Sequence, residues 1–291
     1  MNQILINIIY SASIYLLIAF SFSLVYYTTK FFHFAHAAII TFSAYFTYYF
    51  FQQLNFSIWI AVPSAIILSV LLGMLIELGI YKQLRKKNTS PLLMLIASLG
   101  LYVVLQNCIS MLWGDDTKSI RTGEVKVGNE IFGAYITDIQ IITIVLSFKL
   151  LVLSLLFYRY TKLGRQMRAV AANSELANIV GINSNKVILW SFGIGSCLAA
   201  VAGILVASDT GLTPTMGFNL LLYGVVAMII GGVGSTWGLI GGAFLLATAQ
   251  HLTAYYIDSK WMDAITYIIL ILFLIWKPLG FSGKRLKKIE I

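Results

Sequence analysis

Long apolar segments without charged residues recur along this chain and decide what it can fold into. The segment 4–27 contains no charged residue, and at about 1.5 Å per residue it can cross a hydrocarbon core about 30 Å thick. It lacks the basic start and the small-residue cleavage site of a signal peptide, so we interpret it as a retained helix. Further apolar segments cover 32–53, 57–79, 91–113, 139–158, 187–207, 218–233, 239–256 and 263–276.

The composition indicates that most of this surface is solvated by lipid. Hydrophobic residues make up 59% of the chain and charged residues 11%, whereas soluble domains carry about 25% charged residues. The apolar segments are continuous rather than alternating, which predicts helices rather than barrel strands. We expect a single domain, 1–291, with an all-α polytopic membrane fold of about eight to nine transmembrane or re-entrant helices. The run 218–233 is short and ends in glycines, so it is the re-entrant candidate.

Basic residues predict the orientation of the chain, because cytoplasmic loops are enriched in Lys and Arg. They gather in 82–87, in the loop 159–186 and in the tail 277–291, which we expect on the cytoplasmic side. The loop 114–138 is rich in Asp and Glu, and we expect it outside, together with the N-terminus. The net charge of +9 is then a topology signal, and no nucleic-acid partner is expected.

The outer loop 114–138 contains a hairpin signal. Residues alternate between charged and apolar over Glu124–Val127, and Gly128 and Asn129 follow directly. Alternation next to an Asn and Gly turn predicts a small hairpin there.

The inner loop 159–186 contains an amphipathic segment, 164–180, that predicts one short helix or a pair. Ser174 could cap the second helix, and Gly181 is placed to end it, since glycine adopts the left-handed conformation easily. The segment either lies on the lipid surface or docks a cytoplasmic partner, and the pattern leaves both open. Its apolar face comprises Met167, Val170, Ala171, Leu176, Ile179 and Val180, and its polar face Arg165, Arg168, Asn173 and Glu175.

Titratable residues within the apolar segments are few and do not form a catalytic set. His33 and His36 have helical spacing and could bind a metal, but no acidic or thiol ligand is near them in sequence. Hydrogen-bonded packing near the membrane interface is the favoured interpretation, and no metal is expected. Lys149 lies midway along the segment 139–158, where a lysine costs about 2.5–3.5 kcal/mol on insertion scales. It must face a cavity, find a partner or extend its long stem to the interface.

The sequence contains no P-loop pattern, G-x-x-x-x-G-K-[ST], so we expect no bound cofactor and no ATP chemistry on this chain. A glycine run, Gly231, Gly232, Gly234 and Gly238, lies in an apolar setting without a following lysine. Small residues there permit close helix contact, or a backbone break that lines a cavity. Packing alone is the simpler interpretation, and the abundance of glycine favours a broken segment near a pathway.

Four stretches of the sequence together resemble a known pattern. Residues 32–36, Phe-His-Phe-Ala-His, with Ser-Ala-Tyr at 43–45, resemble Asn-Phe-Ala-His-Gly…Gly-Ala-Tyr, with His33 in place of asparagine and Ala37 in place of glycine. The second stretch is 98–100 (SLG), 105–107 (LQN) and 113–114 (WG). The third is 161–171, TKLGRQMRAVA, and the fourth is the glycine run with Lys277-Pro278-x-Gly280-Phe281.

The third stretch continues as Glu175-x-Ala177-x-x-x-Gly181, which is similar to the coupling motif of ATP-binding cassette (ABC) permeases, with Leu176 where alanine is typical. On these stretches, which cover nearly the whole chain, the protein resembles the Liv-type permease family of ABC importers for branched-chain amino acids and related solutes.

The resemblance implies an assembly in a bacterial inner membrane. A second homologous permease would enclose the pathway, two cytoplasmic ABC ATPases would use ATP, and a periplasmic or lipid-anchored binding protein would deliver the solute. The segment 164–181 would contact the ATPases through Gly164, Arg165, Arg168, Glu175, Ala177 and Gly181. His36, Lys149, Gly231, Gly232, Gly234 and Gly238 are candidates for the pathway or for helix packing.

Two alternatives stay open at this point. The chain could be a secondary transporter driven by an ion gradient, with Lys149 or the histidines in coupling. Within the ABC interpretation, the solute could be a branched-chain amino acid, another amino acid, urea or a short amide. An enzyme is a distant third, because no nucleophile and base pair or metal set is visible.

Overall fold

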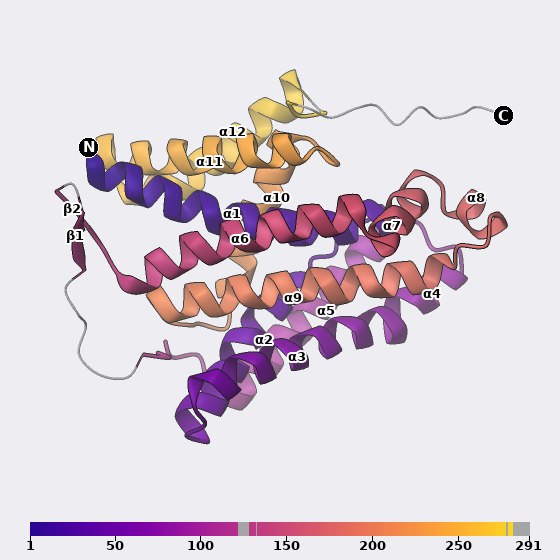
Figure 1. The fold of residues 1–291 in the computed structure, drawn as a ribbon, viewed down its shortest axis with the longest axis horizontal. Coiled ribbons are helices and arrows are strands. Elements are labelled where there is room, and N and C mark those ends of the chain that lie inside the picture. The colour runs from indigo at the N-terminus through magenta and orange to yellow at the C-terminus, as the bar shows by residue number, and fades with distance from the viewer. Residues whose placement is uncertain (122–127, 132, 278, 282–291) are drawn as a thin grey trace.

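The computed structural model describes residues 1–121, 128–131, 133–277 and 279–281. These residues are almost entirely helical (Figure 1). The elements are α1 Asn2–Thr29, α2 His36–Tyr48, η1 Tyr49–Gln53, α3 Ile58–Ile76, η2 Glu77–Tyr81, α4 Lys82–Lys86, α5 Pro91–Trp113, β1 Asn129–Ile131, β2 Ala134–Ile136, α6 Asp138–Tyr160, α7 Lys162–Ala172, α8 Ser174–Ile179, α9 Ser184–Thr210, α10 Met216–Gly231, α11 Thr236–Tyr256, η3 Ser259–Trp261 and α12 Met262–Trp276.

Several helices have the length and composition needed to cross a membrane, as the apolar segments predicted. Within the described residues these are α1, 58–86, α5, α6, α9 and 259–276. α10 has 16 residues, about 24 Å of helix, which is short of a full crossing. The expectation of an all-α polytopic membrane fold is confirmed.

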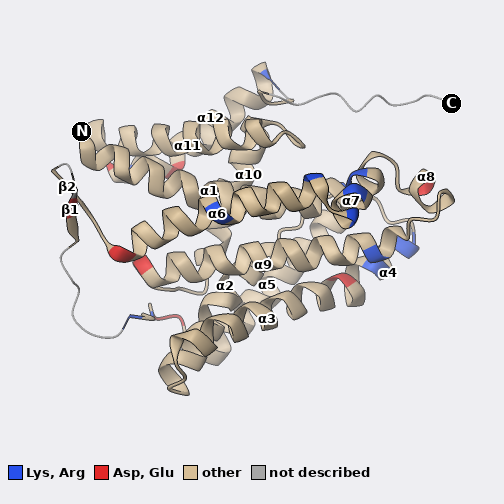
Figure 2. Cartoon of the chain, viewed as in Figure 1, with Lys and Arg blue, Asp and Glu red and all other residues tan. Residues whose placement is uncertain are grey.

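The long helices run alongside one another, and the two ends of the bundle differ in charge. Figure 1 shows the β1–β2 hairpin at one end and α4, α7 and α8 at the other. The Lys and Arg residues of α4 and α7 gather at the α8 end (Figure 2). Basic residues favour the cytoplasmic side of a membrane, so this end has the composition of a cytoplasmic face.

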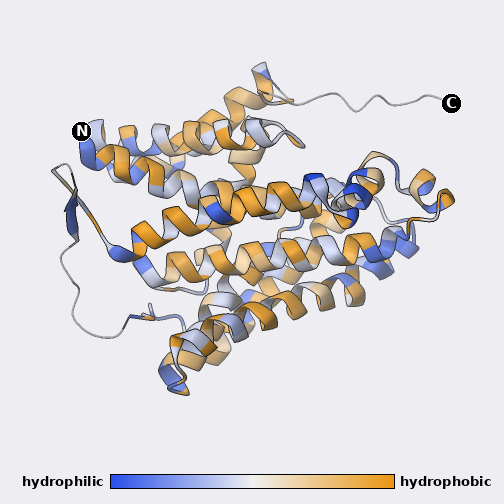
Figure 3. Ribbon diagram, viewed as in Figure 1, coloured by the Kyte–Doolittle hydropathy of each residue, from blue (hydrophilic) through white to orange (hydrophobic). Residues whose placement is uncertain are grey.

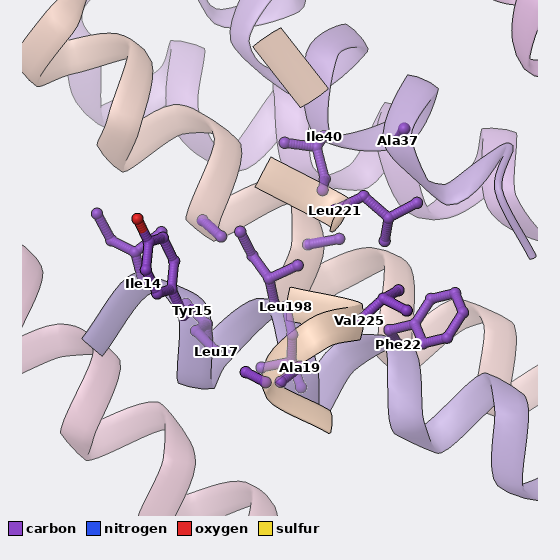
Figure 4. Close-up of a cluster of buried hydrophobic side chains, with 14 of the residues drawn as sticks. Ile14, Tyr15, Leu17, Ala19, Phe22, Ala37, Ile40, Leu198, Leu221 and Val225 are labelled. Atoms are coloured by element: carbon purple, nitrogen blue, oxygen red, sulfur yellow. The ribbon is translucent and has the colours of Figure 1, made fainter. Parts of the chain in front are cut away.

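α1 and α9 form the centre of the bundle and are mostly buried, whereas α3, α5 and α6 leave most of their apolar surface exposed. Figure 3 shows that apolar residues continue along these outer helices. The main core lies where α1 meets α2, α9 and α10 (Figure 4), and it includes Leu17, Ile40, Leu198 and Leu221. Exposed apolar helix faces around a packed centre are what a lipid environment requires.

The start of α2 differs from the prediction. The apolar run suggested a helix from residue 32, but α2 begins at His36, and the preceding residues have no regular helical structure. Ser98 of α5 satisfies this backbone, because its Oγ accepts from the Phe34 N–H and donates to the Phe32 carbonyl, both at 3.1 Å. Non-helical backbone at membrane depth is tolerated only where such partners exist.

The hairpin of the loop 114–138 forms further along the chain than predicted. β1 and β2 are antiparallel with Asn129 opposite Ile136, so the turn follows residue 131 and Gly133 adopts a positive φ of 73°. Asn129 therefore lies in a strand rather than in the turn. The segment 122–127, which carried the alternation, lies outside the described residues, as do 282–291 of the tail.

Candidate functional site

α7 lies across the end of α6 because a glycine permits the close approach. Thr161 caps α7, with its Oγ1 accepting from the Gly164 N–H at 3.0 Å. A Cβ on Gly164 would lie 2.4 Å from the carbonyl oxygen of Tyr158 and 2.6 Å from that of Phe157. Any side chain at this position would therefore push α7 away from the last turn of α6.

Two arginines of α7 turn back onto the same helix end. Arg168 donates from Nη1 to the carbonyl oxygen of Tyr158 and from Nη2 to that of Arg159 at 3.3 Å. Arg165 donates from Nη1 to the carbonyl oxygen of Tyr160 at 3.3 Å. Cations stabilise a helix C-terminus by pairing with its free carbonyls. Both side chains thus fasten α7 to α6, and their contact with a partner stays a prediction.

α8 is capped by Asn173 and not by Ser174, as the sequence had suggested. The Oδ1 of Asn173 accepts from the N–H groups of Glu175 at 2.9 Å and Leu176 at 3.0 Å. Asparagine and serine cap helices about equally well, so their adjacency left the prediction ambiguous by one residue. Gly181 follows the helix with a φ of 86°, in the left-handed conformation predicted for it.

α8 is also fastened to the start of α9. The Oδ1 of Asn178 accepts from the backbone N–H of Ser184 at 3.0 Å and from the Ser184 hydroxyl at 2.8 Å. Ala177 points inward and is 3% exposed. The segment from α7 to Gly181 thus projects from the bundle and is attached to it at α6 and at α9.

The apolar residues predicted for one continuous face fall into two groups. Those of α7 are buried inside the chain, whereas those of α8 face outward and form an exposed tip with Glu175 beside them. Ile179 is 78% exposed and Val180 73%. The buried group is Met167, Val170 and Ala171; the exposed group, called here the α8 tip, is Leu176, Ile179 and Val180.

Three of the buried residues of α7 and α8 belong to a second core cluster at the α8 end of the bundle. This inner cluster contains Met167, Val170 and Ala177 together with aromatic residues of other elements. The aromatic members are Phe31, Tyr81 and Phe192.

His33 and His36 are fully buried beside the inner cluster. The Nδ1 of His33 lies 2.9 Å from the Tyr81 hydroxyl oxygen, and the Nε2 of His36 lies 3.1 Å from that of Ser21. No group of three metal-ligating side chains occurs within the described residues. Each histidine thus makes one hydrogen bond inside the bundle, whereas the Nε2 of His33 and the Nδ1 of His36 are buried without a hydrogen-bond partner among the described residues. Packing as their role stays a prediction.

The glycine run joins α10 to α11 in close contact. A Cβ on Gly231 would lie 2.2 Å from the carbonyl oxygen of Gly238, and a Cβ on Gly238 would lie 2.0 Å from that of Gly231. Gly232 and Gly234 have positive φ values of 92° and 86° in the intervening turn. Close packing and turn geometry therefore account for all four glycines, and a role in the pathway stays a prediction.

Lys149 lies on the outer face of α6. It is exposed, as are Val145 and Val152 on the same face. No acidic side chain among the described residues lies within ion-pair distance of it. Lys149 therefore lines no interior of its own chain, and any contact it makes within an assembly is with lipid or with another subunit.

Comparisons with known proteins show the family of this chain. A family model described as the permease component of branched-chain amino acid transport systems matches residues 4–274. The chain belongs to this family. LivH of Salmonella typhimurium, a high-affinity branched-chain amino acid transport system permease, is 31% identical over 97% of this chain and 95% of LivH. BraD of Pseudomonas aeruginosa, described in the same words, is 31% identical with the same two coverages.

Two further comparisons show a partial sequence match and a likeness of fold. The xylose transport system permease XylH of Haemophilus influenzae is 33% identical, over 35% of this chain and 29% of XylH. A solved structure, PsaBC from Streptococcus pneumoniae in complex with Fab, superposes with a TM-score of 0.51 at 13% identity, covering 94% of this chain and 91% of that chain. At that identity the likeness shows the fold alone.

One pair in this permease-family protein was missed at the sequence level. Glu77 is 1% exposed and pairs with Arg85, whose Nη1 donates to its Oε2 at 3.0 Å. Glu77 opens the π-helical segment η2, which ends at Tyr81. The sequence signal for this pair was a lone carboxylate in an apolar run, followed two helical turns later by an arginine.

Proposed function

We propose that this permease is one transmembrane subunit of an ATP-driven importer for branched-chain amino acids. It assembles in the bacterial inner membrane with a second permease, two cytoplasmic ABC ATPases and a solute-binding protein outside. The full-length similarity to LivH and BraD supports the solute class, since both are described as branched-chain amino acid permeases. This chain holds no cofactor, and the ATPases use the ATP.

The exposed α8 tip is the observation that carries the coupling role. Three apolar side chains project from the basic end of the bundle on the α7–α8 segment, which is fastened to α6 through Arg168 and to α9 through Asn178. Apolar side chains exposed together outside the bilayer mark a protein contact more often than a free surface. Because the segment is attached at two places, a force on the α8 tip can reach α6 and α9. A loosely attached helix would not transmit that force.

The residues predicted for coupling divide by task in this proposal. Gly164, Arg165 and Arg168 hold α7 against the end of α6, and Ala177 anchors α8 from inside. Glu175 is exposed beside the tip and is available to a basic group of an ATPase. Gly181 ends the projection. The docking interpretation is favoured over a helix resting on lipid, because a lipid-resting helix has no need of this fastening.

Substitution of the tip tests the proposal. We expect Ile179→Ser to remove most co-purification of the ATPases and most leucine uptake, while the amount of permease in the membrane is unchanged. Leu279→Ser is the matched control, because Leu279 is 43% exposed and follows the last helix. Normal ATPase binding by the Ile179 variant would overturn the docking role. Uptake of urea but not of leucine by the wild-type complex would overturn the proposed solute class.

A further inference from the structure

A buried tyrosine connects the inner cluster to the unwound segment before α2. Tyr81 closes η2 and is completely buried, and its ring centroid lies 4.9 Å from that of Phe31 and 5.7 Å from that of Phe192. These rings pack with Met167 and Val170 of α7. Tyr81 is therefore held by the same cluster that holds α7 and α8.

The same side chain reaches His33 with its polar end. The Tyr81 hydroxyl and the His33 Nδ1 are 2.9 Å apart, and the two rings meet edge to face at 5.0 Å. The Glu77–Arg85 ion pair stabilises the π-helical turn from which Tyr81 projects, and this fixes the position of Tyr81. Single π-helical turns inside helices are frequent at functional sites.

His33 lies in the non-helical residues that lead into α2, where the backbone can change its dihedral angles without breaking a helix. The next turn starts α2 with His36, bound to Ser21 of α1. α2 in turn supports α10, because the Thr41 Oγ1 accepts from the Gly217 N–H at 3.2 Å. A displacement of Tyr81 would therefore be passed to the start of α2 and from there to α10.

We propose that the Tyr81–His33 hydrogen bond transmits movement of the α7–α8 segment to α2, so that both are positioning residues for transport. The inference rests on the docking role proposed for the α8 tip. It adds the contact by which the motion leaves the inner cluster, since Tyr81 touches that cluster with its ring and α2's lead-in segment with its hydroxyl. Coupling of this kind requires an element that both sites bias.

Removal of the hydroxyl alone gives the sharpest test. In Tyr81→Phe the ring still packs on Phe31 and Phe192, so assembly and ATP hydrolysis by the complete importer are expected to stay at the wild-type level. Leucine transported per ATP, measured in proteoliposomes, is expected to fall by about tenfold, the factor carried by one buried hydrogen bond of ordinary strength.

Substitutions of His33 separate the hydrogen bond from the imidazole ring. The Nδ1 atom is bonded to Cγ, so it occupies the place of a terminal side-chain atom in asparagine. We expect His33→Asn to keep the bond and most of the coupling, and His33→Leu to lose both. Adding Tyr81→Phe to His33→Leu should cause no further loss, since the two changes remove one interaction.

Tyr15→Phe is the matched control for a merely structural effect. The Tyr15 hydroxyl donates to the Gln250 Oε1 at 2.6 Å in the main core, so its loss removes a buried tyrosine bond outside the inner cluster. We expect Tyr15→Phe to lower thermal stability about as much as Tyr81→Phe without changing transport per ATP. Equal transport per ATP in both variants and the wild type would overturn the proposal.

Hydrogen–deuterium exchange separates this inference from the proposed function. In the wild-type complex in nanodiscs, a non-hydrolysable ATP analogue should change exchange in 174–181 and in 31–48. In Tyr81→Phe only the change in 174–181 should persist. A wild-type response confined to 174–181 would overturn the relay and leave docking intact, whereas no response in either segment would overturn docking itself.

Discussion

The guanidinium of Arg168 lies against the backbone of Tyr158, donating to its carbonyl oxygen while stacking over its ring at 5.3 Å. The carbonyl belongs to the last turn of α6, which has no intrahelical donor to offer it. The contact therefore closes the end of one spanning helix with a side chain from α7. Because α8 follows α7 directly, this contact also helps to fix the position of the α8 tip relative to α6.

The first prediction concerns the charge of this contact. Arg168→Glu would set a carboxylate against carbonyl oxygens, and we expect it to abolish uptake and ATPase binding while membrane insertion stays normal. Loss of a charged hydrogen bond costs about 1.5–3 kcal/mol before repulsion is added. Arg165→Glu should have a smaller effect, since Arg165 is exposed and makes a single 3.3 Å bond. Equal activity of the two variants would contradict the capping role.

The second prediction compares two glycines of α11. Gly238→Ala would place a Cβ 2.0 Å from the Gly231 carbonyl oxygen, whereas a Cβ on Gly241 meets nothing within 4 Å. We expect Gly238→Ala to lower the melting temperature and uptake, because α10 and α11 must separate. Gly241→Ala should be neutral or stabilising, by up to about 1 kcal/mol from helix propensity. Thermal unfolding in detergent measures both, and equal melting temperatures would disprove the close contact.

The third prediction concerns Lys149. It lies mid-span on an exposed face of α6, and a lysine there opposes insertion by about 2.5–3.5 kcal/mol on biological scales. We expect Lys149→Leu to increase the inserted fraction of α6 in a translocation assay, with Val145→Leu unchanged as the control. A decrease would mean that Lys149 has a stabilising partner outside this chain.

The helices were predictable because continuous apolar runs leave a membrane chain few choices, whereas the exceptions depend on distant partners. The unwinding before α2 needs Ser98, a residue of another helix. The sequence placed Arg168 on the polar face of its helix, but it did not reveal the acceptors of Arg168, because these are backbone carbonyls, which leave no mark in sequence. The burial of Glu77 needs a π-helical turn and Arg85. Local pattern thus predicted the short helices of 164–181, and their attachments to α6 and α9 were found only in three dimensions.

The last prediction concerns the opposite end of the bundle, where the loop 114–138 is pinned to α9. Arg121 donates to the Asp209 Oδ1 from Nη2 at 2.9 Å and to the Ser208 carbonyl from Nε at 2.7 Å. Backbone bonds between Lys118 and Leu212 continue the attachment. The Asp209 side chain is 9% exposed against 35% for Arg121, so the carboxylate would suffer more from losing its partner.

We expect Arg121→Gln to lower the free energy of unfolding by about 1–3 kcal/mol, the cost of a buried charged group left poorly satisfied. In an Asp209→Asn background the same substitution should cost much less, because the remaining amide needs no cation. A double-mutant cycle on melting temperatures in detergent isolates the pair. Additive effects of the two substitutions would show that the ion pair does not hold this loop.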